Sequence, residues 1–379
     1  MTGVSPLKKP SIFINRLLIE NLNLKTENLK IAIYYDWLNQ WGGAERVLLD
    51  ILKLYPHADI FTLDYDPQKT PWLPKNRVVY SLNLKNKLLY TPFYSFALEK
   101  IDFSNYDILI STTSHVGHSF LTLPSTLFIC YFHNVNRYLY QHSPPLLKGP
   151  LKKYRKSDYI YGQRPDYLLC NSRTVASRIK RAYGRSAKVI YPGIDTKKFI
   201  PNKLKPKKYF LIVSRLVSHK NIDLAIQAFS KLPYKLKIVG IGRNQNYLKK
   251  IASPYSNIIF LDSVGEKKLL SLYQNCQALI HPQEEDFGLT ALEVQACGRG
   301  VIAYQKGGAT ETVIKNQTGV FFNQATPESL RKAVEKYLSL DINSQNCRTH
   351  ALRFDHHLFM LHFKQTVDHL WQQKIKTTT

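Results

Sequence analysis

Residues 281–301 read HPQEEDFGLTALEVQACGRGV. Two carboxylates in this stretch, Glu285 and Glu293, are separated by seven residues, and a helix is expected to begin near Gly288. The free backbone N–H groups and the positive dipole end of such a helix stabilise an anion. Glu285 then lies in the loop before the helix, and Glu293 lies about one and a half turns inside it. This layout suits a nucleotide diphosphate that carries a sugar.

Strand-like and helix-like patterns alternate along the chain around this stretch. Short runs rich in β-branched and aromatic residues alternate with segments whose apolar residues recur at helical spacing. Repeated units of strand, turn and helix predict an α/β protein with doubly wound domains. We expect strands at 29–38, 57–66, within 106–119 and 126–140, and at 188–199, 235–244, 258–265, 278–282 and 301–305; helices at 45–55, 84–100, 266–276, 327–340 and 354–375; and a strand followed by a helix within 166–184 and 209–232.

The length of 379 residues favours two domains. A segment rich in proline and lysine, 196–208, has no apolar period and is interpreted as the linker between them. The predicted organisation is an N-terminal tail (1–28), an N-terminal acceptor domain (29–195), the linker, a C-terminal donor domain (209–353) and a C-terminal helix that packs back towards the N-terminal domain (354–379).

The sequence carries 53 basic and 27 acidic residues, a formal net charge of +26. This balance predicts attraction to polyanions such as nucleic acid, an anionic membrane surface or phosphorylated substrates. Between Lys148 and Lys188 the basic residues are interleaved with tyrosines. Both a solvated basic face and a membrane-contacting surface fit that segment.

The five cysteines are scattered and none forms a C-x2-C pair, so neither a disulfide framework nor a zinc site is expected. No run approaches the roughly 18 apolar residues of a membrane helix. The first residues lack the pattern of a secretory signal. We therefore expect a cytoplasmic protein.

Polar residues gather where several expected strands end. In a parallel sheet, ligands bind at the edge formed by the carboxyl ends of the strands. His115, His133 and Arg137 are expected to lie at that edge. The Gly42-Gly43 pair follows the first strand and would allow a ligand close to the backbone, although a plain tight turn explains the pair equally well.

Two basic residues, Arg215 and Lys220, follow the first strand of the C-terminal half. A planar guanidinium and a compact ammonium beside a helix start suit a pyrophosphate. No D-x-D pair follows a strand in a way that suggests a metal-bridged diphosphate, so neither a metal nor a cofactor is expected.

Four motifs of the C-terminal half occur in order: S-R-L-V-x-x-K (214–220), E-D-F-G-L-x-x-L-E (285–293), G-G-x-x-E (307–311) and T-G-V-F-F (318–322). Together they resemble the retaining glycosyltransferases of family 4, also called group 1 transferases. In the N-terminal half, GGAERV, ISTTSH and CYFHNVNRY are similar to the branch of mannosyltransferases that build O-antigen and other surface polysaccharides, including lipopolysaccharide. The chain departs from that branch at Val135 and Gly300, where the branch usually has proline.

The resemblance implies a GT-B fold, two facing Rossmann-like domains with a cleft between them. It implies that Arg215 and Lys220 hold the donor diphosphate, that Glu293 binds the ribose and that Glu285 binds the donor sugar. His133 would contact the sugar near the reacting carbon. The catalytic candidates are therefore His133 and Glu285; the donor-binding candidates are Gly42, Gly43, Arg215, Lys220, Phe287, Gly288, Leu289, Thr290 and Glu293; and the acceptor-side candidates are His115 and Arg137.

The predicted activity is transfer of a hexose, by preference mannose from GDP-mannose, to a glycan or lipid-linked acceptor. We expect retention of configuration without a metal, because fixed cations and N–H dipoles can hold the departing phosphates. The enzyme could contact an anionic membrane peripherally on its inner face. Two alternatives remain at this point: a sugar-nucleotide epimerase of the same fold, and a nucleic-acid-binding protein, which no sequence motif supports.

Overall fold

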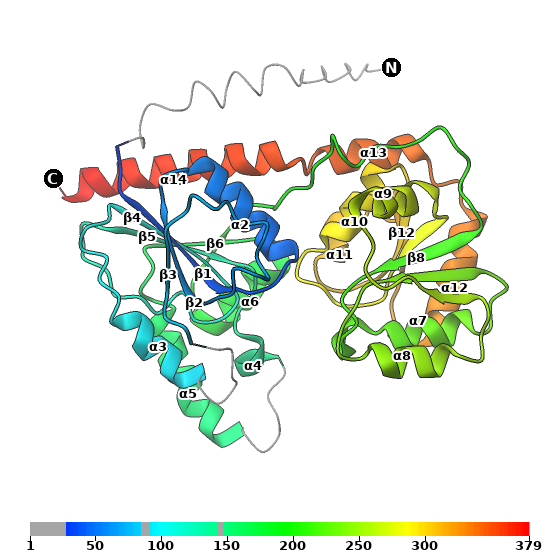
Figure 1. The fold of residues 1–379 in the computed structure, drawn as a ribbon, viewed down its shortest axis with the longest axis horizontal. Coiled ribbons are helices and arrows are strands. Elements are labelled where there is room, and N and C mark those ends of the chain that lie inside the picture. Colours follow the sequence, from blue (N-terminus) through cyan, green and yellow to red (C-terminus); the bar gives the residue numbers. More distant parts are fainter. Residues whose placement is uncertain (1–27, 85–90, 142–147, 379) are drawn as a thin grey trace, which may run out of the picture. The chain divides into compact units, whose positions relative to one another are not determined.

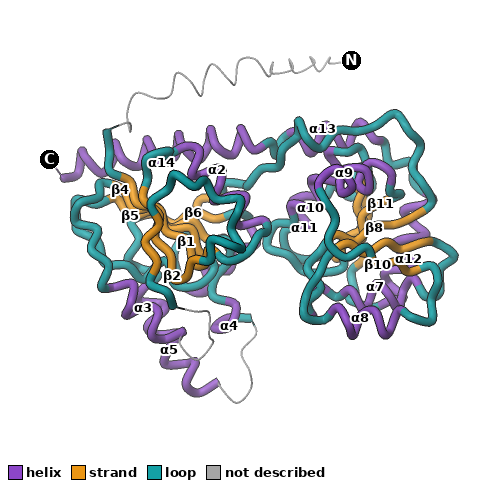
Figure 2. The backbone as a smooth tube through the Cα atoms, viewed as in Figure 1, coloured by secondary structure: helices purple, strands orange, loops and turns teal. Residues whose placement is uncertain are grey.

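The computed structural model describes residues 28–84, 91–141 and 148–378. These residues form two parallel β-sheets with helices packed around each sheet (Figures 1 and 2). The chain divides into two compact units: the first contains 1–130, 160–167 and 359–379, and the second contains 131–159 and 168–358. The domain limits expected from the sequence remain predictions.

The first sheet has seven strands in the order β3-β2-β1-β4-β5-β6-β7. Its central strands are buried along almost their whole length, as expected when helices cover both faces of a parallel sheet. The strand order changes direction between β1 and β4, which makes that point a ligand-binding position of such folds. The strands are β1 (Ile31–Leu38), β2 (Asp59–Tyr65), β3 (Val79–Ser81), β4 (Ile108–Thr113), β5 (Leu127–Phe132), β6 (Tyr167–Cys170) and β7 (Lys188–Val189).

Among the helices of this part of the chain, α6 begins at a side-chain cap and ends at a glycine. Ser172 accepts a hydrogen bond from the Val175 N–H and so caps α6, and Gly184 ends that helix with a φ of 69°. The side-chain amide of the preceding residue, Asn171, donates to the His133 carbonyl. The helices are α2 (Gly43–Leu54), α3 (Thr91–Glu99), α4 (Arg137–Tyr140), α5 (Lys148–Tyr161), α6 (Arg173–Tyr183) and α14 (His356–Thr378).

The second sheet has six strands in the order β10-β9-β8-β11-β12-β13, with its change of direction between β8 and β11. One apolar core joins it to α7, α8 and α12, and a second core joins it to α9, α10 and α13. The strands are β8 (Tyr209–Val213), β9 (Lys235–Val239), β10 (Ile258–Phe260), β11 (Ala278–His281), β12 (Gly300–Tyr304) and β13 (Gly319–Phe322). The helices are η3 (Ser218–Lys220), α7 (Ile222–Phe229), α8 (Gln245–Ala252), α9 (Glu266–Asn275), α10 (Leu289–Ala296), α11 (Ala309–Thr312), α12 (Pro327–Ser339) and α13 (Ser344–Leu352).

The strand expected at 188–199 is wrong over most of its length, because β7 ends at Val189. Pro192 cannot donate to a ladder, and Gly193 packs so tightly that a Cβ there would lie 2.3 Å from the His356 Cα. Of the helix expected at 84–100, Thr91–Glu99 is observed as α3, and 85–90 lies outside the described residues. The basic stretch that starts at Lys148 begins as α5, which the sequence pattern did not predict.

The departure from the family pattern at Gly300 has a local explanation. A Cβ on Gly300 would lie 2.6 Å from the hydroxyl oxygen of Tyr337. That hydroxyl donates to the Gln277 carbonyl at 3.1 Å and is therefore held in place. Proline cannot fit here while Tyr337 occupies this space.

The cysteines and the hydropathy of the helices can be examined in the described residues. All five cysteines are buried, and none of them forms a disulfide within the described residues. Among the described helices, none combines the length and apolar character needed to cross a membrane.

Candidate functional site

The strand order of the second sheet brings Lys220 and Glu285 together. Lys220 ends the turn that follows β8, and Glu285 lies in the loop after β11; these two strands are neighbours where the sheet changes direction. Lys220 Nζ forms an ion pair with Glu285 Oε1. The two predicted donor-binding loops therefore meet at the ligand-binding edge of the sheet.

Lys220 lies among other cations. The pKa of Lys220 is lowered from its usual value to about 7, chiefly by burial and also by the guanidinium groups of Arg137 and Arg215, while Asp286 opposes the shift. The exposed Arg215 side chain makes no hydrogen bond or ion pair within the described part of the chain. Three cations crowd this site, and a bound polyanion would relieve their mutual repulsion.

The backbone around Glu285 is held by the Gly307-Gly308 pair. The Gly308 N–H donates to the Glu285 carbonyl at 2.7 Å. Gly307 has a φ of 66°, and a Cβ on it would lie 2.3 Å from the same carbonyl oxygen. A Cβ on Gly308 would lie 2.3 Å from the Phe287 Cα. Glycines at both positions thus allow this close approach, which sets the position of the Glu285 loop.

The helix start expected near Gly288 is confirmed, because α10 begins at Leu289 with Gly288 as its N-cap at a φ of 95°. Phe287 is buried and stacks on Tyr191 at a ring distance of 5.5 Å. Leu289 and Thr290 are half-buried in the first turn. Their backbone N–H groups belong to the helix end that attracts anions.

Glu293 lies in the interior of the second unit. Its side chain is fully buried, and its Oε2 accepts a hydrogen bond of 2.7 Å from the Tyr273 hydroxyl. The role of Glu293 in ribose binding stays a prediction. A ribose contact would require this buried carboxylate to become accessible to the nucleotide.

A buried histidine, His281, lies at the end of β11 next to this site. It ends β11 and is buried beneath Gly288, where a Cβ would lie 3.5 Å from the imidazole. Burial lowers its pKa to about 3, and the nearby Lys220 cation contributes. His281 is therefore a neutral neighbour of the cationic site.

The segment after β5 lies in the same unit as these loops and brings His133 and Arg137 to them. Arg137 pairs with Asp286, and the Asn134 amide donates to the Asp286 carboxylate at 3.0 Å. His133 is buried, which lowers its pKa to about 4, with Asp286 opposing the shift. At neutral pH its imidazole is therefore uncharged.

Arg178 completes this network and was missed by sequence reasoning. It is buried on α6 and donates to Asp286 at 2.5 Å and to Glu284 at 2.8 Å. The adjacent acidic residues of the E-E-D sequence gave a signal that cations would be needed there. Nothing in the spacing indicated which of the many Arg and Lys residues would supply them.

Glu311, the last residue of the G-G-x-x-E motif, caps a helix distant from it in the chain. Its carboxylate accepts hydrogen bonds from the backbone N–H groups of Arg173 (2.8 Å) and Thr174 (3.0 Å) at the start of α6. The Tyr191 hydroxyl also donates to it at 2.9 Å. This carboxylate complements the positive end of the α6 dipole.

The remaining predicted residues, Gly42, Gly43 and His115, belong to the first unit. Gly42 caps α2, whose first residue is Gly43. His115 follows β4, is buried, and packs against the Trp37 ring at 4.9 Å. Their roles toward a donor or acceptor stay predictions.

A buried carboxylate, Asp36, organises the ends of β1 and β4. The Thr113 hydroxyl donates to it at 2.7 Å and the Ser114 N–H donates at 2.7 Å. Burial raises its pKa to about 6, while these hydrogen bonds oppose the shift. Thr113 in turn accepts from the His115 N–H at 2.9 Å, so Asp36 indirectly positions the His115 loop.

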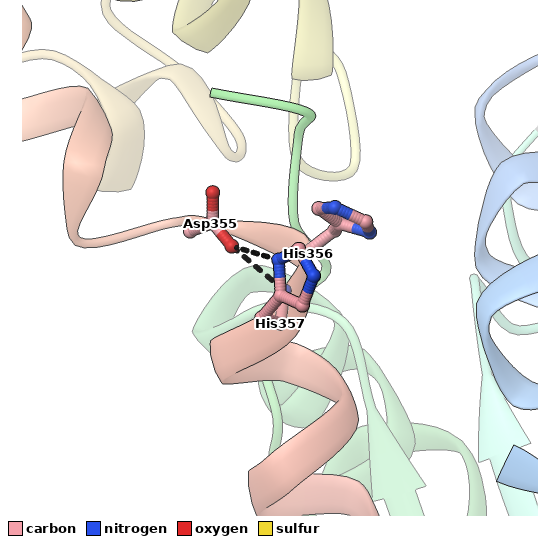
Figure 3. A group of neighbouring side chains, drawn as sticks. All are labelled: Asp355, His356 and His357. Atoms are coloured by element: carbon pink, nitrogen blue, oxygen red, sulfur yellow. Dashed lines mark hydrogen bonds and ion pairs between the residues drawn. The ribbon is translucent and has the colours of Figure 1, made fainter. Parts of the chain in front are cut away.

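Asp355, His356 and His357 form a group whose ligand atoms are close enough to hold a metal ion (Figure 3). The Asp355 carboxylate already accepts from the His357 N–H at 2.8 Å, and His357 Nδ1 lies 2.8 Å from the same oxygen. The Thr196 hydroxyl contacts its other oxygen. These bonds are those of a cap at the start of α14, and they account for the arrangement.

Comparison with known families agrees with this geometry. Residues 193–354 match the family model described as "Glycosyl transferases group 1", and residues 41–198 match the model described as "Glycosyltransferase Family 4". The two matches together include both sheets' ligand-binding edges. The chain belongs to the group 1, family 4 glycosyltransferases.

Among the relatives of this glycosyltransferase is an alpha-1,3/1,6-mannosyltransferase of Schizosaccharomyces pombe, 25% identical over 372 residues that cover 79% of this chain and 72% of the relative. A GDP-mannose-dependent alpha-(1-6)-phosphatidylinositol monomannoside mannosyltransferase of Mycolicibacterium smegmatis is 28% identical over 207 residues, covering 47% of this chain and 54% of the relative. With several relatives, including the latter, the chain therefore matches only about half of their length.

Solved structures show the same fold. A sucrose-phosphate synthase of Thermosynechococcus elongatus has a TM-score of 0.74 at 16% identity, covering 91% of this chain and all of that chain. Alr3699/HepE of Anabaena, solved with UDP and glucose, has a TM-score of 0.68 at 19% identity, covering 90% and 99%. The α/β, GT-B fold class predicted for this glycosyltransferase is confirmed.

Proposed function

We propose that this glycosyltransferase transfers a mannosyl residue from GDP-mannose to a glycan or lipid-linked acceptor, with retention of configuration, in surface polysaccharide synthesis. The observation that carries the donor part is the cationic site at the edge of the second sheet. Lys220 is buried beside Glu285, and Arg215 and Arg137 are close enough to lower its pKa. A site that gathers three cations suits a diphosphate.

The bond between the sugar and the diphosphate would break with negative charge developing on the phosphate oxygens. Arg215, Lys220 and the N–H groups at the start of α10 supply fixed positive charge and dipoles for that charge. We propose that transfer is metal-independent because these groups supply the positive charge at the phosphates. The Arg215 fork would bind phosphate oxygens in a bidentate manner and Lys220 as a point charge.

Retention requires the acceptor oxygen to attach on the face that the diphosphate leaves. In the proposed step, the bond from the anomeric carbon to the phosphate oxygen breaks and the bond to the acceptor oxygen forms. The acceptor proton passes to the departing phosphate oxygen, and the products are a glycoside and a nucleoside diphosphate. Neutral His133 would hydrogen-bond the sugar near the reacting carbon, and Glu285 would bind its hydroxyls.

The preference for mannose and guanosine rests on the relatives. One relative is GDP-mannose-dependent by name, and others are mannosyltransferases by name. A solved neighbour binds UDP, so uridine nucleotides are the competing donors.

A lipid-linked acceptor at an anionic membrane surface is supported by α3. Phe93 and Phe96 are 63% and 57% exposed, and they line a hollow of about 390 Å³ together with Lys100. Exposed aromatic residues beside a cation suit the interface of an anionic membrane. Sedimentation with anionic and neutral vesicles tests this: a Phe93→Ser, Phe96→Ser double variant should lose binding to anionic vesicles. Equal binding by the variant and the parent protein would contradict the proposal.

The activity is tested by offering GDP-mannose, UDP-glucose and UDP-galactose in the presence of a chelator, with calorimetry for binding and NMR for the product anomer. We expect the tightest binding with GDP-mannose and an α-linked product. An inverted anomer would refute retention. Release of an altered sugar without an acceptor would indicate an epimerase, and salt-dependent retention of RNA or DNA without nucleotide-sugar binding would indicate a nucleic-acid-binding protein.

A further inference from the structure

Two indole rings of the first unit lie together at the protein surface. Trp41 is 47% exposed, and its ring centroid lies 5.3 Å from that of Trp72 with the planes tilted by 47°. The Trp72 Nε1 donates to the Gln40 carbonyl at 3.0 Å, which fixes its orientation. The Arg46 guanidinium lies 5.9 Å from the Trp41 ring centroid. We call Trp41 and Trp72 the tryptophan pair.

The tryptophan pair is built from the loops that follow two neighbouring strands. Trp41 follows β1 and precedes the cap of α2, and Trp72 follows β2. The amide of Asn39 bonds to Asp64 at 3.2 Å, joining the ends of these strands. Loops at the carboxyl ends of parallel strands are where such sheets bind ligands.

The surroundings of the tryptophan pair are polar. The side chain of Gln40 is exposed, and its amide donates to the carboxylate of Glu45 at 3.0 Å. Glu45 is itself buried and also accepts from the buried Tyr35 hydroxyl at 2.6 Å, so this carboxylate anchors the Gln40 side chain beside the indoles. Arg46 adds a positive charge. An exposed aromatic surface with hydrogen-bonding groups around it differs from the apolar hollow beside α3, and it is poorly suited to a hydrocarbon chain.

The chemistry of a pyranose ring fits this combination. Its C–H groups carry partial positive charge and pack on the negative face of an indole, while its hydroxyls project sideways toward polar groups. Tryptophan offers the largest and most rigid aromatic surface for such packing, with two side-chain torsions to immobilise. A nucleobase would also stack on an indole, so the test must separate the two ligands.

We propose that the tryptophan pair binds a pyranose ring of the acceptor glycan. The proposal rests on the proposed function in one respect, namely that the acceptor is a carbohydrate. Trp41 and Trp72 are then specificity-determining residues for the acceptor, and the Arg46 guanidinium lies beside the Trp41 ring.

The experiment measures sugar binding by the full chain without any donor. Saturation-transfer NMR is recorded with methyl α-D-mannopyranoside and with α-1,2-, α-1,3- and α-1,6-linked mannobiose. We expect at least one of these sugars to bind, and Trp41→Ala and Trp72→Ala each to weaken its binding by about tenfold. Trp41→Phe should retain part of the affinity. Tyr247→Ala removes a comparably exposed aromatic residue, 54% exposed on α8, and should change nothing.

Calorimetry with GDP-mannose on the same variants separates this proposal from the proposed function. Unchanged nucleotide-sugar affinity together with lost mannoside binding supports the tryptophan pair as an acceptor surface. Weakened nucleotide-sugar binding with unchanged mannoside binding would overturn it in favour of base stacking. Absence of mannoside binding by the parent protein, or equal binding by the variants, would also overturn it. Failure of the proposed function would instead appear as no nucleotide-sugar binding by the parent protein.

Discussion

Lys220 Nζ forms an ion pair with Glu285 Oε1, although the two residues are 65 positions apart in the chain. Each follows a strand at the point where the second sheet changes direction. A donor diphosphate at this edge would compete with Glu285 for the ammonium. Glu285 would then be released to accept hydrogen bonds from the hydroxyls of the donor sugar. The pair thus couples the two predicted donor-binding loops.

Replacing Lys220 with alanine should lower kcat by about 100-fold to 1000-fold, because a fixed charge at the leaving phosphates is lost. The fold should remain, because the buried ammonium itself is removed and the Glu285 side chain left without it is 22% exposed and can be hydrated. Initial rates with a nucleotide sugar and circular dichroism measure the two effects. Lys249→Ala is the matched control, because Lys249 pairs with Asp262 at 2.8 Å on the exposed surface of the same unit. Parent-like turnover in Lys220→Ala would exclude a role at the diphosphate.

Donor binding should weaken as the pH rises above 7. In the free protein burial and neighbouring cations hold the pKa of Lys220 at about 7, so the side chain is largely neutral above that pH. A bound diphosphate favours the ammonium and raises its pKa, so binding takes up a proton. Between pH 7 and 8.5 the affinity should fall by up to about tenfold per pH unit. Below pH 7 this dependence should disappear, because Lys220 is already charged.

The pH effect is measured by calorimetry with a nucleotide sugar, in buffers of different ionisation enthalpy. Lys220→Arg provides the control, because the guanidinium stays charged throughout the range. Its donor affinity should be independent of pH. A slope in Lys220→Arg equal to that of the parent protein would assign the titration to another group.

Asp286→Asn should destabilise the second unit by about 3 kcal/mol, because the buried Arg178 loses its carboxylate partner. For a unit of this size the melting temperature should fall by roughly 6–12 °C. Glu284, the other partner of Arg178, has a side chain that is 46% exposed. Glu284→Gln should therefore lower the free energy of unfolding by less than about 1 kcal/mol. Thermal melts followed by circular dichroism test the pair. Equal shifts in the two variants would contradict the central role of Asp286.

Glu311→Ala should expose the first turn of α6, because the N–H groups of Arg173 and Thr174 lose their acceptor. The expected loss of stability is about 1 kcal/mol. Faster hydrogen exchange at these two amides, measured by mass spectrometry or NMR, reports the local effect. Glu335→Ala on the exposed face of α12 is the control. Unchanged exchange in Glu311→Ala would mean that the cap is made by other groups.

Much of this architecture could be predicted from local pattern. The alternation of apolar strands with amphipathic helices indicates an α/β fold, because burial on two faces requires it. The helix start at Gly288 could be predicted from the short stretch 281–301 alone. Prediction failed where a neighbour distant in sequence decides the local structure, as at Gly193, which follows Pro192 and lies against the His356 backbone.

The sequence by itself determined the fold class, the family and the two loops that carry Lys220 and Glu285, since each depends on residues close together in the chain. Only the tertiary structure decided that Arg178 pairs with Asp286, that Glu311 caps α6, and that Trp41 lies against Trp72. Each of these contacts joins two segments that are distant in sequence, and many other side chains of the same type could have made such a contact. Their choice depends on sheet order, burial and the distances left between packed elements, which no local pattern encodes.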